Sequence, residues 1–142
     1  MNYSNSKTTP IYVDLVVFLV RIFVGFAMLS HGFPKLQQLL EGGEIKFFDF
    51  LGFGPQISLI LTVFAEFVCS ILLILGLFTR VATGFLIFTM AIAAFVVHGS
   101  DLFEKRELSL LYLSVYLLII SFGAGKISVD YMIEKRKRSS DW

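Results

Sequence analysis

Long apolar stretches dominate the chain and predict membrane-spanning helices. A helix needs about 20 mostly apolar residues to cross about 30 Å of hydrocarbon. Four stretches meet or approach this length: Ile11–Ser30, with the helix continuing towards Leu40, Ile57–Leu77, Val81–Val97 and Leu108–Phe122. The predicted fold is therefore an all-α membrane protein, built as an antiparallel bundle of four transmembrane helices.

Polar connections separate these stretches. The first, EGGEIKFFDFLGFGPQ, contains helix-breaking glycines and a proline, and its aromatic residues suit the membrane interface. Only LFTR joins the second and third stretches, which should form a tight antiparallel pair. We expect one transmembrane domain over residues 11–133, a short N-terminal segment over 1–10 and a basic tail over 134–142.

Composition supports a membrane protein and excludes some other classes. Of the 142 residues, 56% are apolar and 16% are charged, whereas soluble domains are typically about a quarter charged. The net charge of +1 provides no surface for nucleic acid. The single cysteine, Cys69, cannot form an internal disulfide or a CxxC pair.

Basic residues in the loops predict the orientation, because they favour the cytoplasmic side of a membrane. With four spans, the side that holds both termini would carry Lys7, Arg80, Lys126, Lys135, Arg136, Lys137 and Arg138. The other side would carry only Lys35, Lys46, Lys105 and Arg106. We therefore expect a multi-pass protein of the inner or plasma membrane, with both termini, including Trp142, in the cytoplasm.

Two charged residues lie within the apolar stretches. At 1.5 Å per residue, Arg21 lies about 15 Å from the inner end of its helix and Glu66 about 13.5 Å from the outer end of the next. An unpaired charge at such depth costs a few kcal/mol. We therefore predict an intramembrane ion pair between Arg21 and Glu66. Such a pair is either a structural pin or a functional site, and the sequence favours neither.

Small and polar residues gather on one face of each predicted helix, which is typical of inward packing faces in lipid. Tyr112 and Tyr116 point away from the face predicted for their helix. The four faces contain Arg21, Gly25, Gly32 and Lys35; Thr62, Glu66, Cys69 and Ser70; Gly84, Ala91, Ala94 and His98; and Glu107, Ser114, Ser121 and Gly125.

Four titratable residues lie near the predicted outer ends of three helices: His31, Lys35, His98 and Glu107. They would form a polar outer vestibule, or else be ordinary interfacial residues at helix ends. Two facing imidazoles could ligate haem or a metal, or hydrogen-bond a quinone. Haem is not favoured because no further cofactor motif accompanies the histidines, and neither a metal site nor a catalytic set is evident.

The order of these motifs resembles the DoxX family of small four-span membrane proteins. The likeness runs from about Val13 to Ile133 and rests on RIFVGF, HGFPKL, AEFVCSILLILGLFTR, MAIAAFVVHG, the acid before LLYL, and GAGKISVD. In one departure, Cys69 and Ser70 stand where the family commonly has glycine. By position, the family's polar set falls on Arg21, His31, Lys35, Glu66, Arg80, His98 and Glu107, with Arg80 on the cytoplasmic side.

The resemblance implies a link to quinones and to membrane-associated redox complexes. Our first expectation is a quinone-associated or redox-linked accessory subunit of a membrane oxidoreductase, not catalytic alone, with a quinone as its conceivable ligand. The alternatives are a transport module for a small solute or proton, and a scaffold that anchors a partner enzyme. The sequence is also compatible with a homo-oligomer.

Overall fold

The computed structural model describes residues 10–140. Residues 1–9 and 141–142, which include Lys7 and Trp142, lie outside the described residues. Every regular element within the described range is helical. In chain order these elements are α1 (Ile11–Glu41), α2 (Pro55–Val63), η1 (Phe64–Val68), α3 (Cys69–Leu75), α4 (Thr79–Ile92), η2 (Ala93–Val97), α5 (Phe103–Phe122) and α6 (Val129–Ser140).

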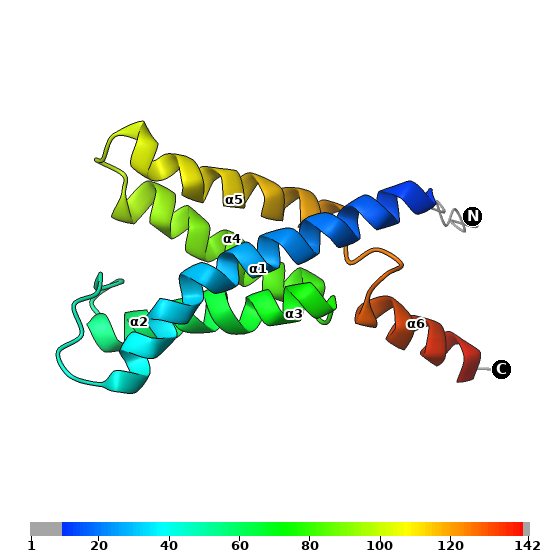
Figure 1. Cartoon of the computed structure of the whole chain (residues 1–142), viewed down its shortest axis with the longest axis horizontal. Helices are drawn as coiled ribbons and strands as arrows, with labels where there is room; N and C mark the ends of the chain where they lie inside the picture. The colour runs from blue at the N-terminus through cyan, green and yellow to red at the C-terminus, as the bar shows by residue number, and fades with distance from the viewer. Residues whose placement is uncertain (1–9, 141–142) are drawn as a thin grey trace.

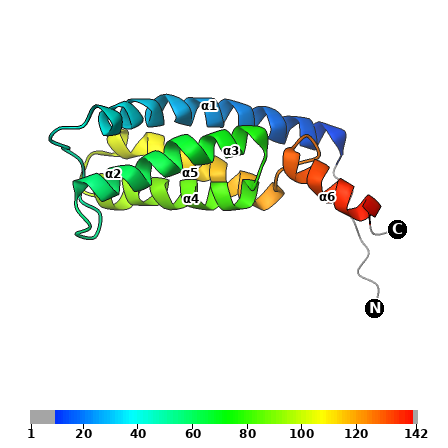
Figure 2. The same cartoon turned by 90° about the horizontal axis from the view of Figure 1, so that it is seen from below.

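The long helices lie side by side, and α6 lies apart from them at one end (Figures 1 and 2). Consecutive long elements run in alternating directions along the axis of the molecule (Figure 1). We call the end where α1 begins and α3 and α5 finish the terminal end. We call the opposite end, which holds the loop 42–54 and the α4–α5 turn, the loop end.

Three helical runs among the described residues are long and apolar enough to cross a membrane: Ile11–Glu41, Pro55–Leu75 and Thr79–Val97. They confirm the first three predicted stretches to within a few residues, including the continuation of the first helix, which ends at Glu41. The α5 helix is 20 residues long, but its first turns contain adjacent charged residues over 104–107. The remaining uncharged part covers only about 22 Å at 1.5 Å per residue, so the fourth predicted span is not confirmed.

Two of the three runs contain a π-helical turn. The Cys69 N–H bonds to the Phe64 carbonyl in η1, and the His98 N–H bonds to the Ala93 carbonyl in η2. Each bond spans five residues instead of four, so the helix is locally widened. Such turns are rare in proteins overall, and those that occur are often found at functional sites. Hydrophobic periodicity does not reveal either turn.

The core lies between α1, α3, α4 and α5, and the predicted packing faces fit only part of it. On α1, Arg21, Gly25 and Gly32 are buried as expected. On α4, Gly84 is partly exposed and the prediction was wrong for that position. Larger residues fill this side of the core, namely Ala82, Thr83, Leu86 and Met90.

The buried face of α5 is the opposite of the predicted one. Tyr116 is fully buried, whereas Ser114 and Ser121 are exposed. Each serine hydroxyl donates to the carbonyl four residues earlier, at Leu110 and Leu117, over 2.8 and 2.7 Å. Because the helix itself satisfies these hydroxyls, they need no partner inside the bundle.

Candidate functional site

Arg21 does not pair with Glu66, contrary to the prediction from the sequence. Arg21 is 1% exposed, and its guanidinium donates to the backbone carbonyls of Ala124, of Ile127 at 3.0 Å and of Ile74 at 3.4 Å. These carbonyls belong to the end of α3 and to the link between α5 and α6. Arg21 therefore acts as a structural clamp at the terminal end of the bundle.

The predicted pair fails because the two helices are offset along their axes. Gly32 packs against η1, where an added Cβ would lie 2.9 Å from the carbonyl carbon of Glu66. Arg21 precedes Gly32 by eleven positions, or about 16 Å along α1. Helical side chains also lean towards the N-terminus, which turns the guanidinium further from Glu66. Equal depth from predicted helix ends would bring the charges together only if both helices started at the membrane surfaces.

A tight turn completes the clamp. The Asp130 carboxylate accepts hydrogen bonds from the N–H groups of Phe78 and Thr79 at 2.8 and 2.9 Å, and so caps the start of α4. The Asp130 N–H donates to the Gly76 carbonyl at 2.9 Å. Gly76 has φ of +68°, and an added Cβ would lie 2.7 Å from the Arg21 guanidinium. Only glycine combines this conformation with this close approach.

Arg80 lies at the same end, away from Glu66. Its side chain is exposed and lines a cavity of about 430 Å³ together with Asp14 and Lys126, which form an ion pair at 3.5 Å. Arg80 therefore belongs to the terminal end.

Glu66 pairs with Lys35 of α1. Lys35 Nζ lies 2.5 Å from Glu66 Oε2, and the exposed fractions of the two side chains are 29% and 5%. Gly32 allows α1 to approach η1 closely, one turn before Lys35. The lysine side chain leans back along α1 and reaches the carboxylate that η1 presents. A nearly buried carboxylate thus receives a charge-assisted hydrogen bond.

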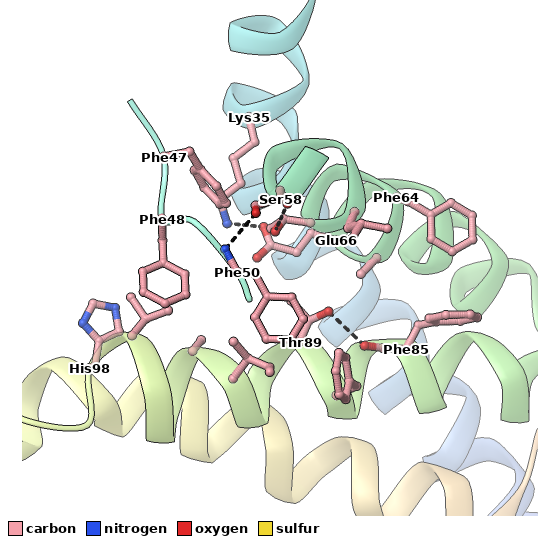
Figure 3. Close-up of a pocket in the computed structure, with 17 residues that line it drawn as sticks. Lys35, Phe47, Phe48, Phe50, Ser58, Phe64, Glu66, Phe85, Thr89 and His98 are labelled. Carbon is pink, nitrogen blue, oxygen red and sulfur yellow. Dashed lines mark hydrogen bonds and ion pairs between the residues drawn. The ribbon is translucent and has the colours of Figure 1, made fainter. Parts of the chain in front are cut away.

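This ion pair forms part of the wall of a mostly apolar cavity of about 380 Å³ (Figure 3). Both π-helical turns contribute to the wall. Its aromatic residues are Phe47, Phe48, Phe50, Phe64, Phe85 and Phe88, and its polar residues are Lys35, Ser58, Thr62, Glu66, Thr89 and His98. A small charged patch faces an aromatic enclosure.

The cavity includes only part of the predicted vestibule. Lys35 and His98 line it, whereas His31 and Glu107 do not. His31 is exposed and packs edge-on against Tyr112, with ring centroids 5.9 Å apart. Glu107 is exposed on α5. It does not line the cavity because α4 lies between the cavity and α5 (Figure 3).

His98 lies beside Phe48, across the cavity from Lys35 (Figure 3). Its Nδ1 lies 2.8 Å from Oδ2 of Asp101, and Nε2 takes no part in that contact. The hydrogen bond with His98 lowers the pKa of the Asp101 carboxyl, so this acid stays ionised and holds the imidazole in place.

The loop 42–54 covers the loop end of the cavity. The Phe50 N–H donates to Ser58 Oγ at 2.8 Å, and the Gly54 N–H donates to Asp49 Oδ1 at 2.9 Å. The Phe50 ring also meets the Phe88 ring edge-on, with centroids 6.0 Å apart. Aromatic residues that were expected to lie in the membrane interface therefore form a roof over the cavity.

Tyr116 is a polar core residue that the sequence interpretation missed. Its hydroxyl and that of Ser70 are buried and have no hydrogen-bond partner among the described residues. Tyr116 stacks on Tyr112, with ring centroids 6.0 Å apart. The spacing of one helical turn between two tyrosines was the available signal.

The cavity combines a hydrogen-bond donor and an acceptor with apolar aromatic walls. Such a combination suits a flat ring that carries oxygen atoms, because rings pack against phenylalanine and the oxygens need polar partners. Among residues 10–139, no group of three or more His, Cys, Asp or Glu side chains is placed to hold a metal ion.

Comparison of the sequence with known families identifies one to which the chain is similar. Residues 16–99 match the sequence profile of DoxX, more than half of the chain. The chain belongs to the DoxX family. Every residue that lines the cavity lies within the matched segment, so the candidate site of this DoxX protein belongs to the shared domain. The α5 and α6 helices lie beyond it.

Two proteins of Haemophilus influenzae, each described as an uncharacterized protein, are similar to this DoxX chain. One is 34% identical over 127 residues, which cover 82% of this chain and 90% of the relative. The other is 25% identical over 131 residues, which cover 87% of each chain. No solved structure matches this DoxX chain.

Proposed function

We propose that this DoxX protein binds a quinone-type ring in the cavity and serves as an accessory subunit of a membrane oxidoreductase. The Lys35–Glu66 pair on the wall of an aromatic cavity carries the proposal. Ligand sites are typically apolar clefts of about 300–1,000 Å³ with a few well-placed polar groups. A cavity of about 380 Å³ has the size of a single substituted ring.

The two charged groups suit both redox forms of such a ligand. Lys35 can donate a hydrogen bond to a quinone carbonyl, and Glu66 can accept one from a quinol hydroxyl. Reduction of a quinone to a quinol takes up two electrons and two protons. The partner oxidoreductase would supply the electrons, while Lys35 and Glu66 would hold the ring and exchange protons with its oxygens.

The proposal includes the topology of the chain. We place α5 as a fourth span, with both termini in the cytoplasm and the loop end outside. Its support is the position of α5 alongside the other long helices and the basic residues of α6 at the terminal end.

A second candidate function is proton or small-solute transport. The unpartnered hydroxyls of Ser70 and Tyr116 favour it, because buried polar groups of this kind commonly bind internal water. Proton flux into protein-containing liposomes, lost in Tyr116→Phe, would support transport over quinone binding.

Ligand binding in nanodiscs tests the first function. We expect saturable binding of a decyl-tailed benzoquinone, and at least a tenfold loss of affinity in Glu66→Gln and Lys35→Met. Each change removes a hydrogen bond to a charged group, worth about 1.5–3 kcal/mol, and about 1.4 kcal/mol is a tenfold change in affinity. Isothermal titration calorimetry would measure the affinities.

Exposed charged residues outside the cavity provide matched controls. Glu104→Gln and Lys46→Met repeat the same chemical changes there and should bind like the parent. The double variant Lys35→Met/Glu66→Gln strands no charge and separates loss of ligand contacts from loss of fold. The proposal fails if the parent does not bind, or if the control variants lose as much affinity as the cavity variants.

A further inference from the structure

We propose that the ligand is a membrane-dissolved ring with an alkyl or isoprenoid tail, which enters sideways from the lipid between α2–η1 and α4. This inference rests on the proposed function and adds the route of entry and the chemical class of the ligand. We call this side of the cavity, formed by Leu61, Phe64, Phe85 and Phe88, the lateral portal.

The large apolar side chains of the portal are exposed on the outer surface of the bundle. Leu61, Phe64, Phe85 and Phe88 are 50%, 41%, 47% and 57% exposed, although all four also line the cavity. One set of side chains therefore forms both the inner wall and the outer surface. An apolar opening of this kind suits lipid and not water.

The portal lies at the depth of the hydrocarbon. Phe64 is nine positions from the start of Pro55–Leu75, and Phe88 is nine positions from the start of Thr79–Val97. Both lie about 13.5 Å from a helix end at 1.5 Å per residue. In the spanning arrangement proposed above, this is close to the middle of a hydrocarbon layer of about 30 Å, where lipid tails would surround the portal.

The roof blocks the alternative route from water. Phe47, Phe48 and Phe50 cover the loop end, and the hydrogen bond from the Phe50 N–H to Ser58 Oγ fixes the roof to α2. A water-borne ligand would have to displace this aromatic layer. A ligand from the lipid has to part only side chains, and within the described residues no backbone hydrogen bond closes the portal as the one from Phe50 to Ser58 closes the roof.

One aromatic pair marks the passage. Phe64 of η1 and Phe85 of α4 meet edge-on, with ring centroids 5.3 Å apart, so they bridge the two walls of the portal. Figure 3 shows both on the side of the cavity away from His98. A ring that enters on this side would have to part these two phenylalanines to reach Glu66, and its tail would stay at the portal, since the head fills the cavity of about 380 Å³.

Photo-crosslinking of the full-length protein in nanodiscs tests the route. The probe is a benzoquinone with a diazirine on its decyl tail, and mass spectrometry locates the modified residues. We expect labelling at the portal residues, at least fivefold lower in the presence of excess unlabelled decyl-tailed benzoquinone. Glu66→Gln should lose most of this labelling, whereas Glu104→Gln should keep it.

Other outcomes separate the two proposals. Competed labelling confined to the roof residues would overturn lateral entry, while the quinone site would stand. A diazirine fatty acid that labels the portal equally well, and that benzoquinone does not displace, would show an ordinary lipid chain there and overturn the ligand class. If decyl-tailed benzoquinone neither binds nor competes, the proposed function itself fails.

Discussion

Two basic residues of α1 have different kinds of partner inside the bundle. Arg21 uses its planar fork to donate to carbonyls from two segments at once, and its contacts are structural. Lys35 carries a compact charge and directs it at the carboxylate of Glu66. The lysine pair also borders a cavity, so its charges can serve a ligand while the arginine contacts cannot.

Double-mutant cycles should distinguish these roles. We expect Lys35→Met and Glu66→Gln to be coupled by about 1–3 kcal/mol in the free energy of unfolding, because the residues share one ion pair. Arg21→Met and Glu66→Gln should instead be additive to within about 0.5 kcal/mol, because the residues share no partner. Chemical denaturation in detergent measures both cycles. Coupling between Arg21 and Glu66 of the size expected for Lys35 would contradict the structure.

The residue types of the site could be predicted from the sequence, but their pairing could not. A charge in an apolar helix needs a partner, and this rule selected Arg21 and Glu66 correctly as buried groups. It did not say that backbone carbonyls would serve Arg21, since carbonyls at a helix end leave no mark in the sequence. The sequence pattern groups Lys35 with the outer vestibule, because position along a helix does not show how far a lysine side chain reaches back towards Glu66.

At the scale of elements, the two π-helical turns and one glycine shape the cavity. Helix existence and length follow from apolar runs; four spans were predicted on that basis, and three of them are confirmed. The axial offset of α1 against η1 depends on the close contact at Gly32, which apolar periodicity does not reveal. The π-helical turns, which change the facing of the residues beyond them, were likewise hidden.

A matched pair of glycine substitutions tests this packing. Gly32→Ala places a methyl group 2.9 Å from the Glu66 carbonyl carbon, so α1 must move away, at a cost of about 1–3 kcal/mol. Gly84→Ala meets nothing within 4 Å and should stabilise α4 by up to about 1 kcal/mol. Thermal unfolding in detergent gives the comparison. A Gly32→Ala variant as stable as the parent would refute the close contact between α1 and η1.

At the scale of the whole molecule, the number of spans decides where the C-terminus lies. With α5 as a fourth span, both termini lie on the same side of the membrane. With only the three runs that are long and apolar enough, they face opposite sides. The distribution of lysine and arginine favours four spans. The charged residues in the first turns of α5 shorten the apolar part of this helix, which is why α5 is not among the three runs.

Reporter fusions resolve this topology. An enzyme that is active only outside the cytoplasm should be silent when fused after Trp142, because four spans return the chain to the cytoplasm. The same enzyme inserted after Ser100, in the α4–α5 turn, with the rest of the chain retained, should be active and serves as the positive control. Activity in both fusions would show that α5 does not cross the membrane.

The Arg21 clamp has a consequence for biosynthesis. The carbonyls of Ala124 and Ile127 follow Arg21 by 103 and 106 residues, so they leave the ribosome about 5–20 s later at typical rates of synthesis. During that interval the first helix holds a cation without its final partners, and the long side chain must reach for the near membrane surface. The bundle therefore cannot close until its last segment arrives, and chains shortened before residue 124 should be cleared by membrane proteases.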